Sequence, residues 1–248
     1  MRAPVGGEGF RGPGGTLTTK NNTVNIGNMT TEDAKDSTLS RAERLRHRSA
    51  ARREAQRGRL RDLLLTVAED QLLAKGYSGF SLREVAEATQ YTPTTIYRHF
   101  RDRDALIEAV LNKWFNQFAS ALAEADRTQA DPSERMLSIG DAYLRFALSQ
   151  PARYRVMFLD RPDIGVLPDG LGLRDDPAFG VLLRACEALC AAGEGGHHEP
   201  TSLAMMLWLA VHGAASLAVV STILDARAAQ HLGLGIVHLM LRGLRVTG

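Results

Sequence analysis

The eight residues from Thr92 to His99 read TPTTIYRH and gather hydrogen-bonding side chains within about two turns of a helix. Hydroxyl and guanidinium groups donate hydrogen bonds to phosphate oxygens, and arginine also recognises the edge of a guanine base. These side chains therefore favour contact with a nucleic-acid duplex. The candidate residues for this contact are Thr92, Thr94, Thr95, Tyr97, Arg98 and His99.

Two short helix signals position these residues. Ser81 followed by Glu84 fits a capping box, which predicts a short helix. Thr92 and Pro93 are favourable at the N-cap and the first helical position, so a second short helix is expected there. Two short helices joined by a tight turn predict a helix-turn-helix, whose second helix enters the major groove of DNA. A capped pair of helices also occurs in all-α enzymes, so this pair alone leaves DNA binding and catalysis as alternatives.

The segment YRHFRDRDALIEAVL, residues 97–111, resembles the signature of the TetR/AcrR family of bacterial transcription regulators. The similarity covers residues 57–115. It implies that the threonines face the groove and that Tyr97, His99 and the start of the bracing helix contact phosphates. Backbone amides at the start of the following helix are expected to do the same. The DNA-binding residues expected in this way are Ser81, Thr92, Thr94, Thr95, Tyr97, Arg98, His99 and Arg103.

Three positions depart from the pattern of that family. Gln90 stands where a turn glycine is usual, Thr94 where a small residue is usual, and Arg103 where a lysine is frequent. A non-glycine residue in the turn is expected to need a left-handed conformation. Arg103 keeps the positive charge, and Thr94 changes how closely the second helix approaches the groove.

Charge is spread unevenly along the 248 residues, whose formal net charge is +2. Residues 1–113 hold 19 lysines and arginines against 14 acidic residues, whereas residues 114–248 hold 11 against 14. This asymmetry predicts that only the first half binds a polyanion. Nine arginines fall between Arg41 and Arg61. We expect the part up to Arg53 to form an arm on the DNA backbone or minor groove, with a solvated tail as the alternative.

The N-terminal residues 1–45 form a basic extension rich in Gly, Thr and Asn, with few large apolar side chains. Such a composition predicts disorder. No apolar run of about 18 residues and no signal-peptide pattern occur, so no membrane partner is expected. Two cysteines are too few for a disulfide framework. These features predict a cytoplasmic protein.

Helical periodicity predicts an all-α protein of about nine helices. An apolar stripe begins near Arg57, and Gly76 is expected to end that helix. Asp102 is expected to cap the helix that follows the helix-turn-helix. The chain then divides into a three-helix DNA-binding domain at 46–113 and a helical-bundle domain at 114–248. Later helices are expected at 132–150, 151–159, 178–192, 201–224 and 227–244, with a loop at 161–177.

The segments PARYRVMFLD (151–160) and LWLAVHG (207–213) together resemble a C-terminal subtype of the same family, named for a Trp-His-Gly block. In that family this domain forms a homodimer and holds a small molecule, which implies a palindromic operator and a small hydrophobic or amphipathic ligand. Helices 201–224 and 227–244 carry small and apolar residues on several faces, as suits a bundle between two copies. The candidate ligand contacts are Tyr143, Phe146, Met157, Phe158, Trp208 and His212.

Plain core packing is the alternative for the aromatic residues among these candidates, because aromatics at helical spacing usually fill a core. A histidine in an apolar helix needs a hydrogen-bond partner, and His212 can find one in a ligand or inside the protein.

Three functions compete at this point. The leading interpretation is a homodimeric repressor that a ligand releases from its operator. A DNA-binding regulator without a small-molecule inducer is the second. A helical enzyme is the third, although no catalytic triad, carboxylate pair, phosphate loop or zinc signature stands out and no cofactor is expected. Cys186 and Cys190 lie four residues apart with His197 and His198 beyond, but no further ligand supports a metal site.

Overall fold

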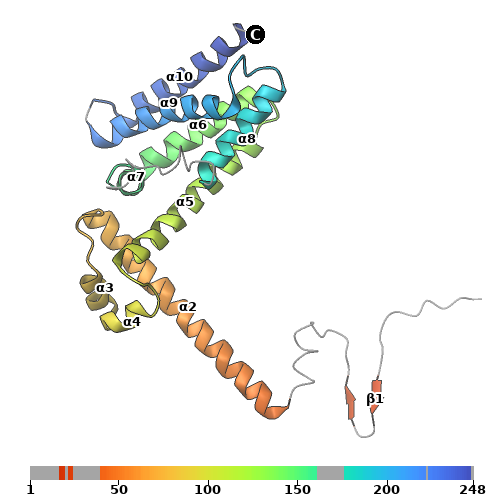
Figure 1. Cartoon of the computed structure of the whole chain (residues 1–248), viewed down its shortest axis with the longest axis vertical. Helices are drawn as coiled ribbons and strands as arrows, with labels where there is room; N and C mark the ends of the chain where they lie inside the picture. The colour runs from red at the N-terminus through yellow and green to blue at the C-terminus, as the bar shows by residue number, and fades with distance from the viewer. Residues whose placement is uncertain (1–16, 20–21, 25–39, 161–175, 222, 247–248) are drawn as a thin grey trace, which may run out of the picture. The chain divides into compact units, whose positions relative to one another are not determined.

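The computed structural model describes residues 17–19, 22–24, 40–160, 176–221 and 223–246. Nine α-helices, α2 to α10 in Figure 1, and one two-stranded hairpin make up this described part. The fold is all-α in its helix-turn-helix and its bundle, as the sequence predicts. The chain divides into two compact units, Met1–Arg59 and Leu60–Gly248. The domain boundaries expected near residues 45 and 113 stay predictions.

The first unit contains a hairpin that the sequence pattern does not predict. Strands β1 (Leu17–Thr19) and β2 (Asn22–Val24) pair antiparallel. The other residues of the expected disordered extension, up to residue 39, lie outside the described residues. Residues 41–45, assigned to the same extension, belong to helix α2.

Helix α2 spans Arg41–Lys75, so the prediction that this helix begins near Arg57 is wrong. A capping box fixes its start. Ser40 N donates to Glu43 Oε2 at 2.7 Å, and Glu43 N donates to Ser40 Oγ at 3.3 Å. The arginines and alanines that follow favour a helix but form no apolar stripe, so periodicity alone misses this segment. The predicted end is confirmed, because Gly76 follows the helix with a φ of 68°.

Helices α3 (Leu82–Thr89) and α4 (Pro93–Tyr97) form the predicted helix-turn-helix. Apolar side chains from α2, α3, α4 and α5 (Arg103–Arg127) meet in one core. Because α4 has only five residues, it is too short to be stable alone in water and depends on this packing. The buried side chains around it include Leu64, Ala68, Leu72, Val85, Ile96, Leu106 and Ile107.

The turn between α3 and α4 places a non-glycine residue in the left-handed region. Gln90 has φ 59° and ψ 26°, and no other non-glycine residue in the described part of the chain has a positive φ. Its N–H donates to Glu87 O at 3.2 Å, and Tyr91 N–H donates to Ala86 O at 3.1 Å, which closes α3. The left-handed conformation expected for Gln90 is therefore confirmed.

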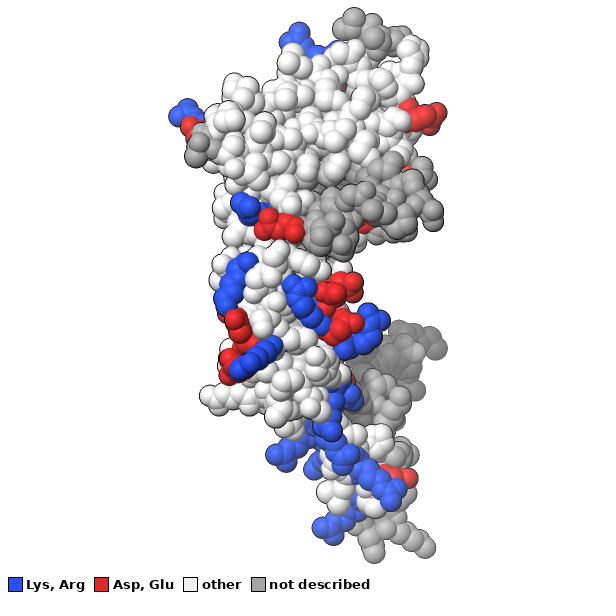
Figure 2. Space-filling view, turned by 60° about the vertical axis from the view of Figure 1, so that its left-hand side comes forward, with Lys and Arg blue, Asp and Glu red and all other residues white. Residues whose placement is uncertain are grey.

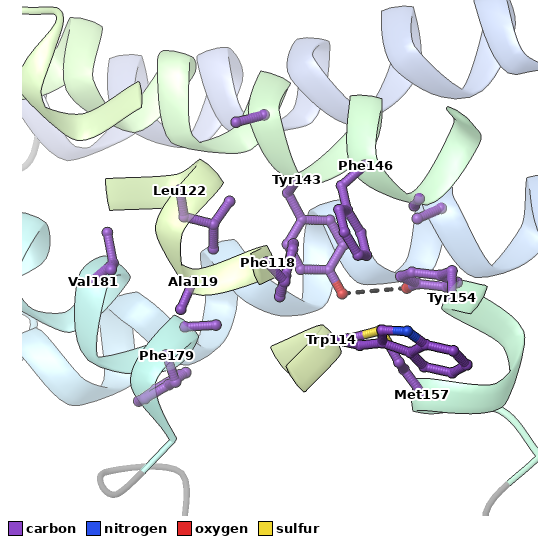
Figure 3. Close-up of a cluster of buried hydrophobic side chains, with 14 of the residues drawn as sticks. Trp114, Phe118, Ala119, Leu122, Tyr143, Phe146, Tyr154, Met157, Phe179 and Val181 are labelled. Atoms are coloured by element: carbon purple, nitrogen blue, oxygen red, sulfur yellow. Dashed lines mark hydrogen bonds between the residues drawn. The ribbon is translucent and has the colours of Figure 1, made fainter. Parts of the chain in front are cut away.

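The remaining helices form a bundle with the C-terminal part of α5. Helix α5 packs against α6 and α8, and α10 packs against α6 and α9, as Figure 1 shows. Aromatic side chains of α5, α6 and α7 meet in the centre of this bundle (Figure 3). The bundle helices are α6 (Pro132–Ser149), α7 (Pro151–Phe158), α8 (Pro177–Ala191), α9 (Pro200–Val220) and α10 (Ala226–Val246).

Most predicted bundle helices agree with the structure to within two residues. Helix α9 is the exception, because it ends at Val220 rather than at residue 224, and Ser221 is extended. The loop expected at 161–177 lies almost entirely outside the described residues. By length and composition α9 is also the one described helix apolar enough to cross a membrane, but core helices pass the same test, and α9 packs against α6, α8 and α10.

Candidate DNA-binding face and ligand cavity

Helix α4 is capped as predicted and turns a polar face outward. Thr92 Oγ1 accepts a hydrogen bond from Thr95 N at 3.4 Å and lies 3.1 Å from Thr95 Oγ1. Ile96 is fully buried and fixes α4 to the core, whereas the Tyr97 side chain is 55% exposed. The predicted residues from Thr92 to His99 thus lie on α4 or directly beside it. Thr92, Thr94, Tyr97 and Arg98 are exposed, while Thr95 and His99 are partly buried.

Ser81 occupies the N-cap position of α3, but the predicted capping box does not form. The Ser81 side chain makes no capping hydrogen bond, and its N–H donates to Gln71 Oε1 at 2.9 Å. Glu84 instead accepts hydrogen bonds from the side chains of Gln71 and Lys75. Gln71 and Lys75 of α2 therefore take the Glu84 carboxylate, which a capping box would bond to the backbone N–H of Ser81. This arrangement leaves the Ser81 hydroxyl unused by the cap.

The side chain of Arg103 is committed to the protein rather than to solvent. Its Nε donates to Phe80 O at 3.2 Å, and a second nitrogen donates to Tyr77 O. Its guanidinium also lies 4.9 Å from the centroid of the Tyr77 ring. Arg103 therefore ties the loop before α3 to the start of α5. Its backbone amide begins α5 behind the Asp102 cap, at the positive end of the helix dipole.

Arginine side chains gather on the N-terminal part of α2. Residues 41–59 contain eight arginines and two glutamates. All of these arginines except Arg44 are exposed. Figure 2 shows them as a dense group of positive side chains, whereas the visible surface of the bundle is mostly uncharged. This segment therefore carries much of the positive charge of the first half of the chain.

An apolar cavity lies inside the bundle, between helices α5, α6, α8 and α9. Its volume is about 60 Å³. Because one water needs about 10–15 Å³ by this measure, only a few water-sized groups fit until the walls move. Asp176, the N-cap of α8, is the one charged side chain among its described lining residues. The other main lining residues are Phe115, Phe118, Leu122, Ile139, Tyr143, Phe158, Phe179, Leu182, Leu207, Trp208 and Val211.

A cluster of polar side chains adjoins this cavity at Tyr143. The hydroxyls of Tyr143 and Tyr154 each lie 2.8 Å from His212 Nδ1 and 3.2 Å from each other (Figure 3 marks the Tyr–Tyr bond). Trp208 stacks on the His212 ring with a centroid distance of 4.7 Å. Burial raises the pKa of both tyrosines and lowers the pKa of His212. All three groups are therefore mainly neutral near pH 7.

Three of the six predicted ligand contacts line the cavity and three do not. Tyr143, Phe158 and Trp208 line the cavity. Phe146 and Met157 do not line it and belong to the core, with Met157 fully buried. His212 has its partner inside the protein, which is the internal hydrogen bond that the sequence left open. The wall residues of α5 were missed, although they continue the apolar stripe of that helix: Phe115, Phe118 and Leu122.

Both cysteines lie on α8 as free thiols. Cys186 is fully buried, and burial raises its pKa to about 12, so it is not a reactive thiolate. Across the described ranges, no group of three or more His, Cys, Asp or Glu side chains gathers as a metal site requires.

Two family models match this chain in the regions just described. Residues 64–110 match the model described as "Bacterial regulatory proteins, tetR family", which covers the helix-turn-helix. Residues 136–232 match "Tetracyclin repressor-like, C-terminal domain", which covers most of the bundle. The chain belongs to the TetR family of transcriptional regulators. As a TetR-family protein it is a DNA-binding regulator and not an enzyme, so the helical-enzyme alternative is excluded.

Similar proteins of known name agree with the TetR assignment. The chain is 26% identical over 200 residues to the HTH-type transcriptional regulator Rv1816 of Mycobacterium tuberculosis, covering 69% of this chain and 85% of that protein. It is 26% identical over 98 residues to the HTH-type transcriptional activator FasR of Mycolicibacterium smegmatis. That match covers 40% of this chain and 45% of FasR, so it spans less than half of that relative.

Solved structures share the fold. A protein of unknown function from Rhodococcus sp. RHA1 aligns with a TM-score of 0.62 at 26% identity, covering 74% of this chain and 94% of that one. A TetR-family regulator from Pectobacterium atrosepticum aligns with a TM-score of 0.60 at 24% identity, covering 77% and 96%. The regulator FadR from Bacillus subtilis, solved in complex with stearoyl-CoA, aligns with a TM-score of 0.54 at 14% identity, covering 73% and 97%.

Proposed function

We propose that this TetR-family protein is a homodimeric repressor, which a small hydrophobic or amphipathic ligand releases from a palindromic operator. One observation carries the proposal: an exposed hydrogen-bonding helix and an apolar internal cavity lie at different places in the same compact unit. A ligand-responsive regulator needs two such separate sites, whose occupancies are coupled.

The exposed face of α4 is assigned to the major groove. Thr92, Thr94 and Thr95 approach base edges, and Arg98 is long enough to reach either a guanine or a phosphate. Phosphate contacts are assigned to the remaining predicted residues, which surround the groove-facing threonines. These are Tyr97 of α4, His99 in the turn after α4, the Ser81 hydroxyl and the backbone amide of Arg103.

The bundle supports a dimer because α9 and α10 keep apolar side chains in solvent. Only 33% of the apolar window of α9 is buried in one copy. The exposed side chains recur at steps of three, four and eight residues, so they form stripes. A second copy of the same chain fits such a surface, because a twofold axis sets each stripe against its equivalent. The stripes contain Leu209, Leu217 and Val220 on α9 and Leu232, Ile236 and Leu239 on α10.

A twofold dimer determines the symmetry of the DNA site. Its two recognition helices enter successive major grooves on one side of the duplex, roughly 34–36 Å apart. The two half-sites are then related by the same axis, so the operator is close to a palindrome.

The cavity supports a ligand that is mainly apolar and has one hydrogen-bonding group. Its walls are aromatic and aliphatic, and the Tyr143 hydroxyl offers a polar contact at one end. A cavity of about 60 Å³ is far below the roughly 300–1,000 Å³ of ligand pockets, so binding must displace the walls. That displacement supplies the conformational change that releases DNA. The stearoyl-CoA bound to FadR supports a long apolar ligand in this fold.

A regulator without a small-molecule inducer is the alternative, and the small size of the cavity favours it. The name of FasR also shows that a similar protein is called an activator. Whether bound protein represses or activates depends on where the operator lies relative to the promoter.

The arginine segment adds to the DNA interface in this proposal. Its exposed arginines are spaced 7, 4 and 7 residues apart, which places them in rows along a helix. Arg41, Arg48, Arg52 and Arg59 form one row, and Arg46, Arg53 and Arg57 form the other. The segment has a single exposed large apolar residue, Leu45, so it lacks the apolar face of a membrane-binding helix. Phosphate backbone is the partner that this chemistry fits.

A binding experiment with matched tyrosine variants tests the DNA face. The purified protein selects duplexes from a random library, and its affinity is then measured by fluorescence anisotropy. We expect Tyr97→Phe to weaken binding about tenfold, because it removes one hydrogen bond to a charged phosphate. Tyr91→Phe is the control, since Tyr91 is 42% exposed in the adjoining turn and has no assigned contact. Equal losses in the two variants, or no selected sequence at all, contradict the assignment.

The ligand is tested separately by thermal unfolding with fatty acids, acyl-CoA thioesters and small phenols. A ligand that stabilises the protein and weakens duplex binding supports the repressor. Duplex binding that responds to none of these compounds favours the alternative without an inducer.

A further inference from the structure

Three donors from two helices converge on a single carboxylate of α2. Lys113 Nζ lies 2.7 Å from Glu69 Oε2, and Trp114 Nε1 lies 2.7 Å from Glu69 Oε1. A nitrogen of Arg153 also donates to Glu69 Oε1 at 2.7 Å. Lys113 and Trp114 belong to α5, whereas Arg153 belongs to α7. The Glu69 carboxylate therefore joins the helix-turn-helix domain to two helices of the bundle.

The contact between Glu69 and Arg153 is shielded from water. The Glu69 side chain is 13% exposed and the Arg153 side chain 19%, against 43% for Lys113. Arg153 lies over the Trp114 ring at 5.1 Å, and its Nε is buried without a hydrogen-bond partner. Burial raises the pKa of Glu69, but the hydrogen bonds from Lys113 and Trp114, together with the positive charges of Lys113 and Arg153, lower it overall. The carboxylate is thus charged and holds Arg153 in a fixed position.

Helix α7 connects the Glu69–Arg153 ion pair to the ligand cavity. Tyr154, the residue after Arg153, bonds to His212, and Phe158 at the end of the same helix lines the cavity. Asp160, two residues after α7, lies close to Gly76, the residue after α2, because a Cβ on Gly76 would come within 3.3 Å of Asp160 Oδ2. Helix α7 therefore contacts α2 through Arg153 in its first turn and lines the cavity through Phe158 at its end.

We propose that Arg153 is a positioning residue that passes a displacement of α7 to the DNA-binding domain through Glu69. A ligand that enlarges the cavity pushes Phe158 and shifts α7. Because Arg153 holds Glu69, α2 shifts with it and moves the helices packed on α2. This inference rests on the proposed function, since it explains how the cavity controls the DNA-binding face.

Reciprocity gives a test that requires no ligand, because DNA binding must then alter α7. Hydrogen exchange of the backbone amides of residues 151–158 is measured with and without a selected duplex. We expect duplex to change this exchange in the parent protein and in Lys113→Gln, but not in Arg153→Gln. Lys113→Gln is the matched control, because it removes another cation from Glu69 without touching α7. Glu69→Gln provides a second variant that breaks the pair, should Arg153→Gln fold poorly in thermal unfolding.

A cavity-filling substitution serves as a surrogate for the ligand. Leu182 lines the cavity, so Leu182→Phe fills part of it. We expect Leu182→Phe to weaken duplex binding about tenfold in the parent, within the usual range of allosteric coupling, and to have no effect in Arg153→Gln.

The outcomes separate this inference from the function on which it rests. If the parent binds duplex and the hydrogen exchange of residues 151–158 does not change, the role of Arg153 is wrong but the proposed function stands. The role of Arg153 is also wrong if duplex changes the hydrogen exchange of α7 in Arg153→Gln and Glu69→Gln as much as in the parent. A parent that prefers no duplex sequence overturns the proposed function, and the role of Arg153 with it.

Discussion

At the scale of single residues, the turn between α3 and α4 holds backbone strain at Gln90, which glycine at this position would relieve. Gln90 is held at φ 59°, where a Cβ costs about 1 kcal/mol and glycine has no steric penalty. The conformation persists because the backbone bonds of Gln90 and Tyr91 to α3 fix it. The turn therefore keeps an exposed side chain two residues before the N-cap of α4, at a cost in stability.

We predict that Gln90→Gly raises the free energy of unfolding by roughly 0.5–1 kcal/mol. For a chain of this length that corresponds to a rise in Tm of about 1–4 °C, measurable by calorimetry. Gln90→Ala is the control, since alanine keeps a Cβ in the same left-handed conformation and should give no such gain. A glycine variant no more stable than the alanine variant contradicts the strain.

His212 gives a prediction for pH. Its pKa in the folded protein is lowered by burial, so the folded protein binds fewer protons there than the unfolded chain does. The stability from neutral His212 is therefore present above the unfolded pKa of about 6.5 and is lost as pH falls through the lowered folded pKa. The described groups in contact with it are uncharged: Tyr143, Tyr154, Phe158 and Trp208.

Urea unfolding between pH 7.5 and 5.5 checks this sign. We expect the free energy of unfolding to fall more steeply with decreasing pH in the parent than in His212→Gln. His197→Gln is the control, because it makes the same substitution at an exposed histidine outside the bundle core. Equal slopes in the parent and in His212→Gln would refute the role of burial.

The sequence predicted the role of a residue when its partner lies nearby in the chain, and failed when its partner lies on a distant helix. Thr92 and Asp102 were predicted as caps because capping involves residues only three apart, and both form the expected bonds. The failure at Ser81 has a different cause, because Glu84 is taken by Lys75 and Gln71 of another helix. Glu69 and Arg153 are 84 residues apart, and no local pattern signals that they meet.

At the scale of elements, apolar periodicity located the helices that bury a stripe. It placed the ends of α6, α7, α8 and α10 to within two residues, but it missed nearly the first half of α2, where the helix has no apolar side to bury. The cavity wall was found only in part for a related reason. Periodicity shows which side chains face inward, but it cannot show where their packing leaves a space.

The arginine rows on α2 give a prediction for salt dependence. Replacing Arg46, Arg53 and Arg57 with glutamine removes up to three phosphate contacts. We expect the slope of log affinity against log salt to become shallower by up to about 2.7, because each contact contributes about 0.9. Relative preference among duplex sequences should hardly change, since phosphate contacts carry no base information.

The matched control removes the same charge from the bundle, through Arg127→Gln, Arg184→Gln and Arg227→Gln, all of which are exposed positions. Net charge falls equally in the two triple variants. If their salt slopes are the same, the segment acts through overall charge, and the arm does not contact DNA.

At the scale of the whole molecule, two surfaces must work together. One recognition helix of five residues presents few base contacts, so specificity for a long site requires a second subunit. The sequence suggested the surface for that subunit through its small and apolar residues, and the structure identifies which of them stay exposed. In the proposed dimer, twofold symmetry links the apolar stripes of α9 and α10 to the spacing of the two DNA-binding faces.

We predict that Leu239→Glu breaks the dimer without unfolding the subunit. Leu239 is 68% exposed in one copy, so a carboxylate there is solvated in the monomer. In the dimer the twofold axis brings the two stripes together and buries that charge unpaired, at a cost of several kcal/mol. We therefore expect the dissociation constant of the dimer to rise at least 100-fold, measured by analytical ultracentrifugation, while Tm at low protein concentration stays close to that of the dissociated parent.

Leu45→Glu is the control, because it makes the same substitution at a residue that is 58% exposed on α2. It should remain dimeric. The Leu239→Glu monomer should bind a palindromic duplex no more tightly than a single half-site, since the advantage of the second half-site comes from linking two recognition helices. A Leu239→Glu protein that stays dimeric moves the subunit interface away from α10. If the Leu239→Glu monomer still prefers the palindrome to a half-site, operator recognition does not depend on a symmetric dimer.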